Sequence, residues 1–152
     1  MLIVRLADLA EVRGLQAAVL RPNGPLPADR PVPDDAVHVG AFEGLAAVGA
    51  ASVVAAPWPG PEVLAGPTWQ LRSMAVRADR RGSGVGRQVL DLAVATAFDR
   101  GAASMWAGAR LEALGFYTCA GWTVVGPRWA KPGVGPHRWV TRTGAPRGDA
   151  AR

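Results

Sequence analysis

The first thirty-five residues show a strand pattern, then a helix pattern, and then a proline-rich segment with neither. Leu2–Leu6 alternates weakly between apolar and polar positions, which predicts a short strand. From Ala7 to Leu20 the apolar residues recur at the three- and four-residue spacing of a helix. Between Arg21 and Asp35 the prolines are too frequent for an interior helix or a central strand. We expect a long loop there.

Strand and helix patterns alternate along the rest of the chain. Segments rich in valine and alanine flank the turn Glu43-Gly44 and predict an antiparallel hairpin. Three further strands and two helices follow, and together they predict a mixed α/β sheet. The elements are expected at Ala36–Ala41, Ala46–Ala56, Trp69–Val76, Gly84–Arg100, Ser104–Ala107, Arg110–Cys119, Trp122–Val125 and His137–Thr141.

The strand over Trp69–Val76 changes phase. Trp69 and Leu71 are apolar in one phase of the pleat, whereas Met74 and Val76 are apolar in the other. A strand that keeps one face buried can change phase only where an extra residue is inserted. We therefore predict a β-bulge at residues 72–74, which leaves backbone groups unpaired.

Composition and charge narrow the class of protein. The 152 residues are 49% hydrophobic and 19% charged, which suits one domain with one core. The net charge of +5 favours an anionic partner. With one cysteine and two histidines, neither a disulfide framework nor a Cys/His zinc site can form, and no metal site is expected. We find no secretion signal or membrane span, which predicts a cytoplasmic protein.

The stretch Arg80–Arg87 carries the strongest chemical signal. Its three glycines, Gly82, Gly84 and Gly86, stand between a predicted strand and a predicted helix. Such a turn can aim several backbone N–H groups at one point beside a helix N-terminus, which suits a phosphate. Only Asp79 opposes the nearby arginines, so the local charge is +3 and suits a diphosphate. Those arginines are Arg77, Arg80, Arg81 and Arg87.

Spacing excludes two other phosphate-binding motifs. A Walker loop requires lysine and then serine or threonine after its last glycine, but Gly86 is followed by Arg87-Gln88. The dinucleotide fingerprint requires glycine at position 87 or 89, where this chain has arginine and valine. The pattern that remains is R-x-x-G-x-G, formed by Arg81, Gly84 and Gly86.

This pattern resembles the pyrophosphate loop of the GNAT superfamily of acyl-CoA-dependent N-acyltransferases. The segment Ala109–Trp122, with its Phe116-Tyr117 pair and Gly-aromatic ending, resembles the helix that follows in that family. The two motifs and the preceding strand cover roughly Trp69–Val125. The resemblance implies a GNAT-like fold: a mostly antiparallel central sheet of about six or seven strands, one of them splayed and bulged, and about four helices. We expect one domain over 1–142 and a disordered tail over 143–152.

The resemblance also implies an activity. Similar proteins move an acetyl group from acetyl-CoA directly to a primary amine of a small molecule or peptide, through a tetrahedral intermediate. Carried over, the backbone after the bulge would bind the pantetheine arm and the acyl carbonyl, and the glycine turn would bind the pyrophosphate. The implied binding residues are Met74, Ala75, Val76, Arg81, Gly82, Ser83, Gly84, Val85, Gly86, Arg87, Phe116 and Tyr117.

The resemblance suggests one general acid and leaves the base open. Tyr117 is the only tyrosine and stands where similar enzymes place the acid that protonates the departing thiolate. We prefer His137 as the base, because a late strand in this fold borders the acceptor pocket and histidine titrates in the useful range. The other candidate bases are His38, Glu43, Glu62 and Glu112.

One departure from the family and one group of aromatic residues bear on the acceptor. Family members often carry asparagine at the exit of the strand before the second helix, where this chain has Gly108. We interpret Trp58, Trp129 and Trp139 as an aromatic wall for an apolar or cationic acceptor, framed by loops 21–35 and 127–136. Trp106 and Trp122 are predicted core residues.

Alternative functions stay open at this stage. The same fold without catalysis would make an acyl-CoA-binding sensor. A basic nucleic-acid-binding protein is a second alternative, disfavoured because the arginines concentrate on one turn. An acyl-enzyme on Cys119 is a third, and direct transfer does not require it. Neither the acceptor nor the oligomeric state, including a homodimer, follows from the sequence.

Overall fold

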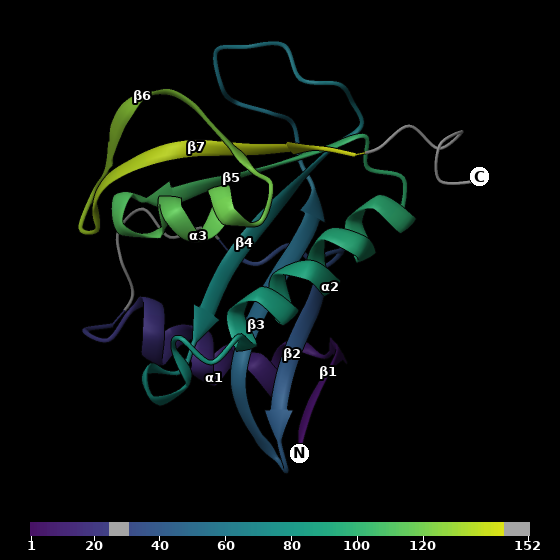
Figure 1. The fold of residues 1–152 in the computed structure, drawn as a ribbon, viewed down its shortest axis with the longest axis vertical. Helices are drawn as coiled ribbons and strands as arrows, with labels where there is room; N and C mark the ends of the chain where they lie inside the picture. Colours follow the sequence, from purple (N-terminus) through teal and green to yellow (C-terminus); the bar gives the residue numbers. More distant parts are fainter. Residues whose placement is uncertain (25–30, 145–152) are drawn as a thin grey trace.

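The computed structural model describes residues 1–24 and 31–144, which form a sheet of seven strands in the order β1-β2-β3-β4-β5-β7-β6 (Figure 1). Every neighbouring pair is antiparallel except β4 and β5. The mixed, mostly antiparallel sheet is as predicted. The strands are β1 Leu2–Ala7, β2 Val37–Glu43, β3 Ala46–Ala55, β4 Thr68–Val76, β5 Ser104–Arg110, β6 Thr123–Lys131 and β7 Gly135–Thr143.

Helices cover both faces of the sheet. The helices within the described residues are α1 Leu9–Leu20, α2 Val85–Asp99 and α3 Leu114–Cys119, with the 3-10 turns η1 Ala78–Arg80 and η2 Leu111–Ala113. α2 and α3 lie on one face and α1 on the other (Figure 1). Val89 of α2 belongs to the main core, whereas Val12 of α1 packs with Phe42 and Ala50 in a smaller cluster.

The predicted bulge in β4 is confirmed. Ala50 of β3 pairs with Ala75, and Ser52 pairs with Arg72, so two β4 residues face the single β3 residue between them. One of the two, Ser73, has a φ of 53°, and no other non-glycine residue in the described ranges has a positive φ. The bulge therefore places the backbone of Ser73 in a conformation that a regular strand does not contain.

Beyond the bulge, β4 leaves its parallel neighbour. The two strands pair only over Thr68–Gln70 and Ser104–Trp106. Further along, β4 continues against β3 to Val76, whereas β5 continues against β7 to Arg110. The two strands diverge in Figure 1, and their facing edges are not hydrogen-bonded to each other along 71–76 and 107–110.

The predicted loop 127–136 is wrong, because the chain forms a hairpin there. β6 runs on to Lys131 and β7 begins at Gly135. Proline is tolerated because β6 is the edge of the sheet and its register against β7 is irregular between Val125 and Trp129. β5 is also longer than predicted, since its last residues pair with β7.

Parts of the predicted 21–35 loop and of the predicted tail, residues 25–30 and 145–152, lie outside the described residues. In the ranges 1–24 and 31–144, no helix combines the length and the apolar character needed to cross a membrane.

Candidate active site

The glycines of the turn before α2 serve two different purposes. Gly82 and Gly84 have φ values of 75° and 88°, in the left-handed region that glycine adopts without strain. Gly86 is already helical, so the prediction that it helps the chain to turn is wrong. A Cβ at Gly86 would lie 3.1 Å from Val76 Cγ2 and 3.3 Å from Phe116 Cε1. Gly86 thus permits close packing of α2 against β4 and α3.

The turn is open to an incoming anion. Arg81, Gly82, Ser83 and Gly84 are exposed, and a Cβ on either glycine of this group would meet no atom within 4 Å. The first N–H groups of α2 begin directly after Gly84 and have no acceptor within the helix. Because the helix dipole adds positive potential at this end, the turn can bind a phosphate group.

Acidic neighbours reduce the charge around this turn. Glu43, which the sequence does not place near the turn, lies 2.5 Å from Arg80 Nη2 and 3.9 Å from Arg77 Nη2. Arg87 pairs with Asp91, its Nε lying 2.9 Å from the carboxylate. Counting Glu43 and Asp91 corrects the local charge from +3 to +1.

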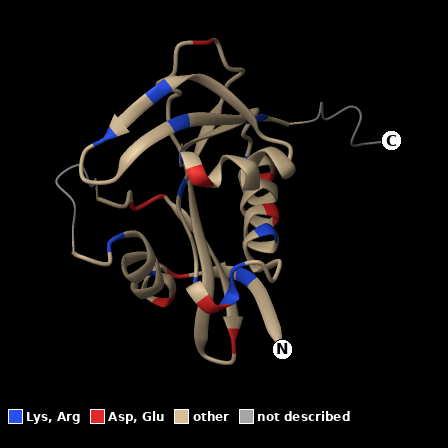
Figure 2. Ribbon diagram, turned by 60° about the vertical axis from the view of Figure 1, so that its left-hand side comes forward, with Lys and Arg blue, Asp and Glu red and all other residues tan. Residues whose placement is uncertain are grey.

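Basic and acidic segments accordingly lie side by side at the start of α2 (Figure 2). Among the four arginines, Arg81 forms no ion pair within the described part of the chain. The hydrogen bond from Arg80 holds the pKa of the Glu43 carboxyl below its ordinary value. Glu43 is therefore ionised and paired at neutral pH, which makes it a poor candidate base.

The residues after the bulge lie where the sheet opens. Ala75 is buried, and Met74 and Val76 are partly buried against the main core. Ala75 and Val76 pair with β3 on one side, and β5 does not pair with them on the other. This stretch therefore has a strand edge with no β5 partner, directly beside the glycine turn.

Tyr117 lies in α3, next to that turn. The contact between Gly86 and Phe116 holds α3 in place, as does a hydrogen bond of 3.3 Å from Arg87 Nη1 to the Cys119 carbonyl. The Tyr117 side chain is 5% exposed and makes edge contacts with Phe116 and Trp122. Burial raises the pKa of the phenol, so the group is protonated at neutral pH.

His137 lies on β7, beside the end of β5 that does not pair with β4. It begins the pairing of β7 with the end of β5, opposite Arg110, and is 5% exposed. Its Nδ1 lies 2.9 Å from the Gly135 carbonyl oxygen, which only accepts, so Nδ1 is the donor in this bond and Nε2 is left for another partner. The ring packs on Trp129, with 4.9 Å between the centroids.

The other candidate residues are scattered. His38 is buried on β2, where desolvation lowers its pKa and its Nδ1 lies 2.7 Å from Ser52 Oγ. Glu62 is exposed in the segment before β4, and Glu112 is exposed in η2. Cys119 is an exposed thiol at the end of α3. The fold therefore does not bring these groups together.

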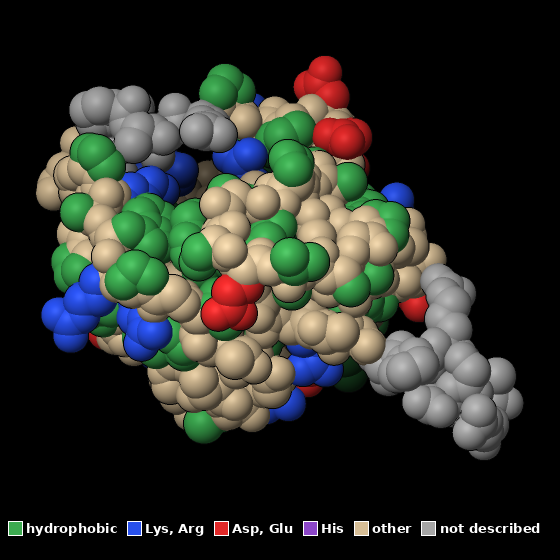
Figure 3. Space-filling view, turned by 90° about the horizontal axis from the view of Figure 1, so that it is seen from above, with side chains coloured by type: hydrophobic (Ala, Val, Ile, Leu, Met, Phe, Trp, Pro, Cys, Tyr) green, Lys and Arg blue, Asp and Glu red, His purple; other side chains and the backbone are tan. Residues whose placement is uncertain are grey.

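Four tryptophans gather on the face of the sheet opposite α2. The ring centroids of Trp58, Trp106 and Trp139 lie 5.7–6.0 Å from one another, and Trp129 packs 4.5 Å from Trp139. Trp106 and Trp122 are buried as predicted, but Trp106 belongs to this group. Trp129 and Trp139 also line a cavity of about 480 Å³ with Pro59, Gly60, Pro61 and Pro127. Seen from above, this face of the molecule carries hydrophobic side chains interspersed with polar and charged ones (Figure 3).

The tryptophan group explains Gly108. A Cβ at that position would lie 2.9 Å from Trp129 Cζ2 and 3.3 Å from Trp139 Cζ3. The room that a side chain would need is therefore taken by indole rings.

Comparison with known proteins identifies the class. Residues 7–122 match the acetyltransferase (GNAT) family. Escherichia coli ElaA has 18% identity and a TM-score of 0.74, over 93% of this chain and 99% of its own. An acyl-CoA N-acyltransferase from Pseudomonas aeruginosa has 14% identity and a TM-score of 0.74, over 94% and 100%. An aminoglycoside 6'-N-acetyltransferase complexed with coenzyme A has 16% identity and a TM-score of 0.70, over 95% and 98%. None of the curated proteins matches this chain.

The chain therefore belongs to the acetyltransferase (GNAT) family, whose acyl donor is acetyl-CoA. These solved structures share the fold of the chain.

One polar residue in the interior was not singled out from the sequence. Gln16 of α1 is 5% exposed and donates to the Ser73 carbonyl oxygen of the bulge at 3.1 Å. The available signal was its place four residues after Val12, on the apolar stripe of the helix. A polar side chain at such a position must find a partner inside the protein.

Proposed function

We propose that this protein transfers an acetyl group from acetyl-CoA directly to a primary amine of a small molecule or peptide. The observation that carries the proposal is the bulged and diverging end of β4, which lies beside the open glycine turn of α2. An unpaired strand edge can bond the amide groups of the pantetheine arm, and a helix N-terminus can bond its pyrophosphate. The strand edge leads to the glycine turn, just as the pantetheine arm of the donor leads to its pyrophosphate.

Donor binding is assigned to residues of both features. Met74, Ala75 and Val76 would bond the pantetheine arm and the acyl carbonyl through their backbone. The turn Arg81–Gly84 and the first turn of α2, Val85–Arg87, would bond the pyrophosphate. Arg81 is the best placed charge, because the other three arginines nearby are already paired with carboxylates.

The chain offers a group for each charge that moves during transfer. The amine nitrogen forms a bond to the thioester carbon, and the carbon–sulfur bond then breaks. A backbone N–H within Met74–Val76 is the proposed donor to the carbonyl oxygen as it gains charge, an effect of about 3–4 kcal/mol in acyl-transfer sites. Burial favours the neutral phenol of Tyr117, which is the proposed proton donor to the departing sulfur.

The acceptor side is assigned to the tryptophan group and His137. His137 Nε2 is the proposed acceptor of the amine proton, directly or through water, because Nδ1 is engaged by Gly135. Trp129 packs on the His137 ring and Trp139 lies beside it, which supports an aromatic wall for the acceptor. The two loops expected to frame the acceptor are not both loops, since 127–136 is a hairpin.

Two measurements on the purified protein test this proposal. Calorimetry should show binding of acetyl-CoA, and a thiol-release assay should show free CoA when members of an amine panel are added. Binding without release across the panel would support the sensor instead. Absence of binding would reject the proposed function.

The role of His137 has its own test. The pH–rate profiles of His137→Ala and of the parent should differ in shape, because the variant lacks the proposed proton acceptor. Profiles of the same shape in the two proteins would remove His137 as the base.

A further inference from the structure

A buried chain of hydrogen bonds links α1 to the bulge. Gln16 Nε2 donates to Ser52 Oγ at 3.2 Å and to the Ser73 carbonyl oxygen at 3.1 Å. Ser52 Oγ in turn lies 2.7 Å from His38 Nδ1. Gln16, Ser52 and His38 are all buried. These hydrogen bonds thus connect β2, β3 and α1 to Ser73, the β4 residue with the positive φ.

The Ser73 carbonyl determines which way the Gln16 amide points. A carbonyl oxygen only accepts hydrogen bonds, so the group that faces it must be the NH₂ end of the amide. Turning the amide over would place two acceptors 3.1 Å apart in a partly buried site. Both hydrogens of Nε2 are then used, one on Ser73 and one on Ser52.

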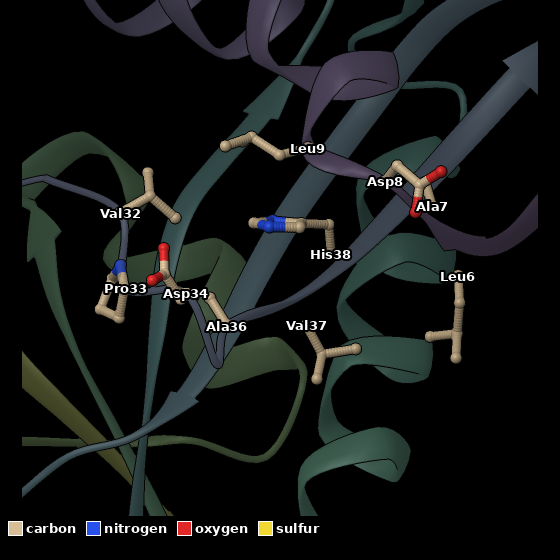
Figure 4. Close-up of a pocket in the computed structure, with 10 residues that line it drawn as sticks. All are labelled: Leu6, Ala7, Asp8, Leu9, Val32, Pro33, Asp34, Ala36, Val37 and His38. Atoms are coloured by element: carbon tan, nitrogen blue, oxygen red, sulfur yellow. The ribbon is translucent and has the colours of Figure 1, made fainter.

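His38 completes the chain at its other end. Because Ser52 Oγ accepts from Gln16, its own hydrogen is available to donate to His38 Nδ1 when the imidazole is neutral. Burial lowers the pKa of His38 and favours that neutral form. The ring projects between Leu9, Val32 and Asp34 in a cavity of about 440 Å³, so the chain ends at accessible space (Figure 4).

The bulge is the part of the sheet that needs such a partner. Its extra residue takes the Ser73 carbonyl out of the regular ladder with β3. A partly buried carbonyl without a partner is unfavourable, and a positive φ at a non-glycine residue adds strain. The Gln16 bond offsets both effects, at the residue immediately before Met74.

We propose that Gln16 is a positioning residue for acyl transfer: by bonding the Ser73 carbonyl, it fixes the bulge and thereby the backbone of Met74–Val76. This inference rests on the proposed function for its effect on the rate. Helix α1 supplies no group to the proposed chemistry. Through Gln16 it would nevertheless control where the β4 backbone lies relative to the acyl carbonyl.

The test uses matched variants of the full chain. Gln16→Met keeps the approximate length of the side chain and removes both donors, whereas Gln16→Glu keeps the shape and presents acceptors to Ser73. Arg13→Met changes an exposed residue of the same helix and serves as the control. If either Gln16 variant does not fold, Ser52→Ala removes the second partner of Gln16 together with the bond to His38, and it leaves the Gln16–Ser73 bond in place.

Two readouts separate positioning from general stability. Amide hydrogen exchange over residues 72–76 reports on the bulge without any substrate. Steady-state kinetics, expressed per molecule that binds CoA, report on kcat and KM. A misplacement of about 1 Å can lower a rate by roughly 10²-fold.

We expect both Gln16 variants to exchange faster over 72–76 and to lose kcat by roughly 10- to 100-fold, with KM for the amine within about two-fold of the wild type. Ser52→Ala should change both readouts in the same direction by less, and Arg13→Met should change neither. Folded Gln16 variants with wild-type kcat, or with unchanged exchange over 72–76, would overturn the inference. If the wild type itself has no turnover, the proposed function fails, while exchange still decides whether Gln16 fixes the bulge.

Discussion

The indole of Trp129 lies so close to Gly108 that a single added carbon would collide with it, 2.9 Å from Cζ2. The Trp139 ring stands 4.5 Å away from the Trp129 ring and closes the same space. The glycine on β5 and the two indoles on β6 and β7 are therefore one packing unit. A substitution at any one of these three residues should therefore disturb the packing of the other two.

Gly108→Ala should lower the free energy of unfolding by about 1–3 kcal/mol, because the rigid rings leave no room for the methyl group. Denaturant unfolding measures the loss, and adding Trp129→Leu should recover part of it. Gly14→Ala is the control, since a Cβ there meets nothing within 4 Å on helix α1 and should stabilise by about 0.5–1 kcal/mol. Equal stability of Gly108→Ala and the wild type would contradict the packing.

Arg81→Ala should weaken CoA binding roughly 10-fold, because it removes the one arginine of the turn without an ion pair among the described residues. Calorimetry at two ionic strengths should show the loss to be larger at low salt. The unfolding free energy should change by less than about 0.5 kcal/mol. Arg100→Ala, at the opposite end of α2, is the matched control and should bind CoA like the wild type. Equal losses in the two variants would remove Arg81 from the site.

Tyr117→Phe should lower kcat by roughly 10²- to 10⁴-fold while the ring keeps its contacts with Phe116 and Trp122. Because burial raises the pKa of the phenol above its ordinary value, Tyr117 stays protonated across the working range. The ratio of wild-type to variant turnover should therefore stay constant from pH 6 to 9. Unchanged turnover in the variant would discard the acid role, and a ratio that varies with pH would point to another titrating group.

The contribution of Glu43 to stability should depend on pH. Its folded pKa lies below the ordinary 4.5 because Arg80 bonds its ionised form. The stabilisation is therefore complete above the unfolded pKa and is lost as the pH falls through the folded value. Thermal unfolding of the wild type and of Glu43→Gln should differ at pH 6–7, and the difference should shrink as the pH falls below 4.5. A difference that persists at low pH would mean that charge pairing with Arg80 is not its source.

Local patterns predicted the parts of the site that one segment creates. The phase change between Leu71 and Met74 located the bulge, because the period of a strand allows no other account of it. The glycines at 82 and 84 located the left-handed turn, because those backbone angles are open to glycine. Both features depend on residues adjacent in the chain.

Features made by distant segments were missed or misread. Glu43 bonds Arg80 because β2 ends beside η1, and no pattern in the sequence predicts a contact between these two residues. Gln16 meets Ser73 across 57 residues. The sequence predicts a loop over 127–136 because proline usually ends a strand, whereas the edge of the sheet tolerates it.

The short ladder between β4 and β5 divides the hydrogen-bonded sheet into two parts. One half is the sheet β1–β4 and the other is β5, β7 and β6, and three residue pairs in the parallel ladder connect their strands. A molecule lodged between the diverging edges would bond to both halves and supply the cohesion that the ladder lacks. Recognition of such a ligand and mechanical integrity of the sheet would then arise from the same bonds.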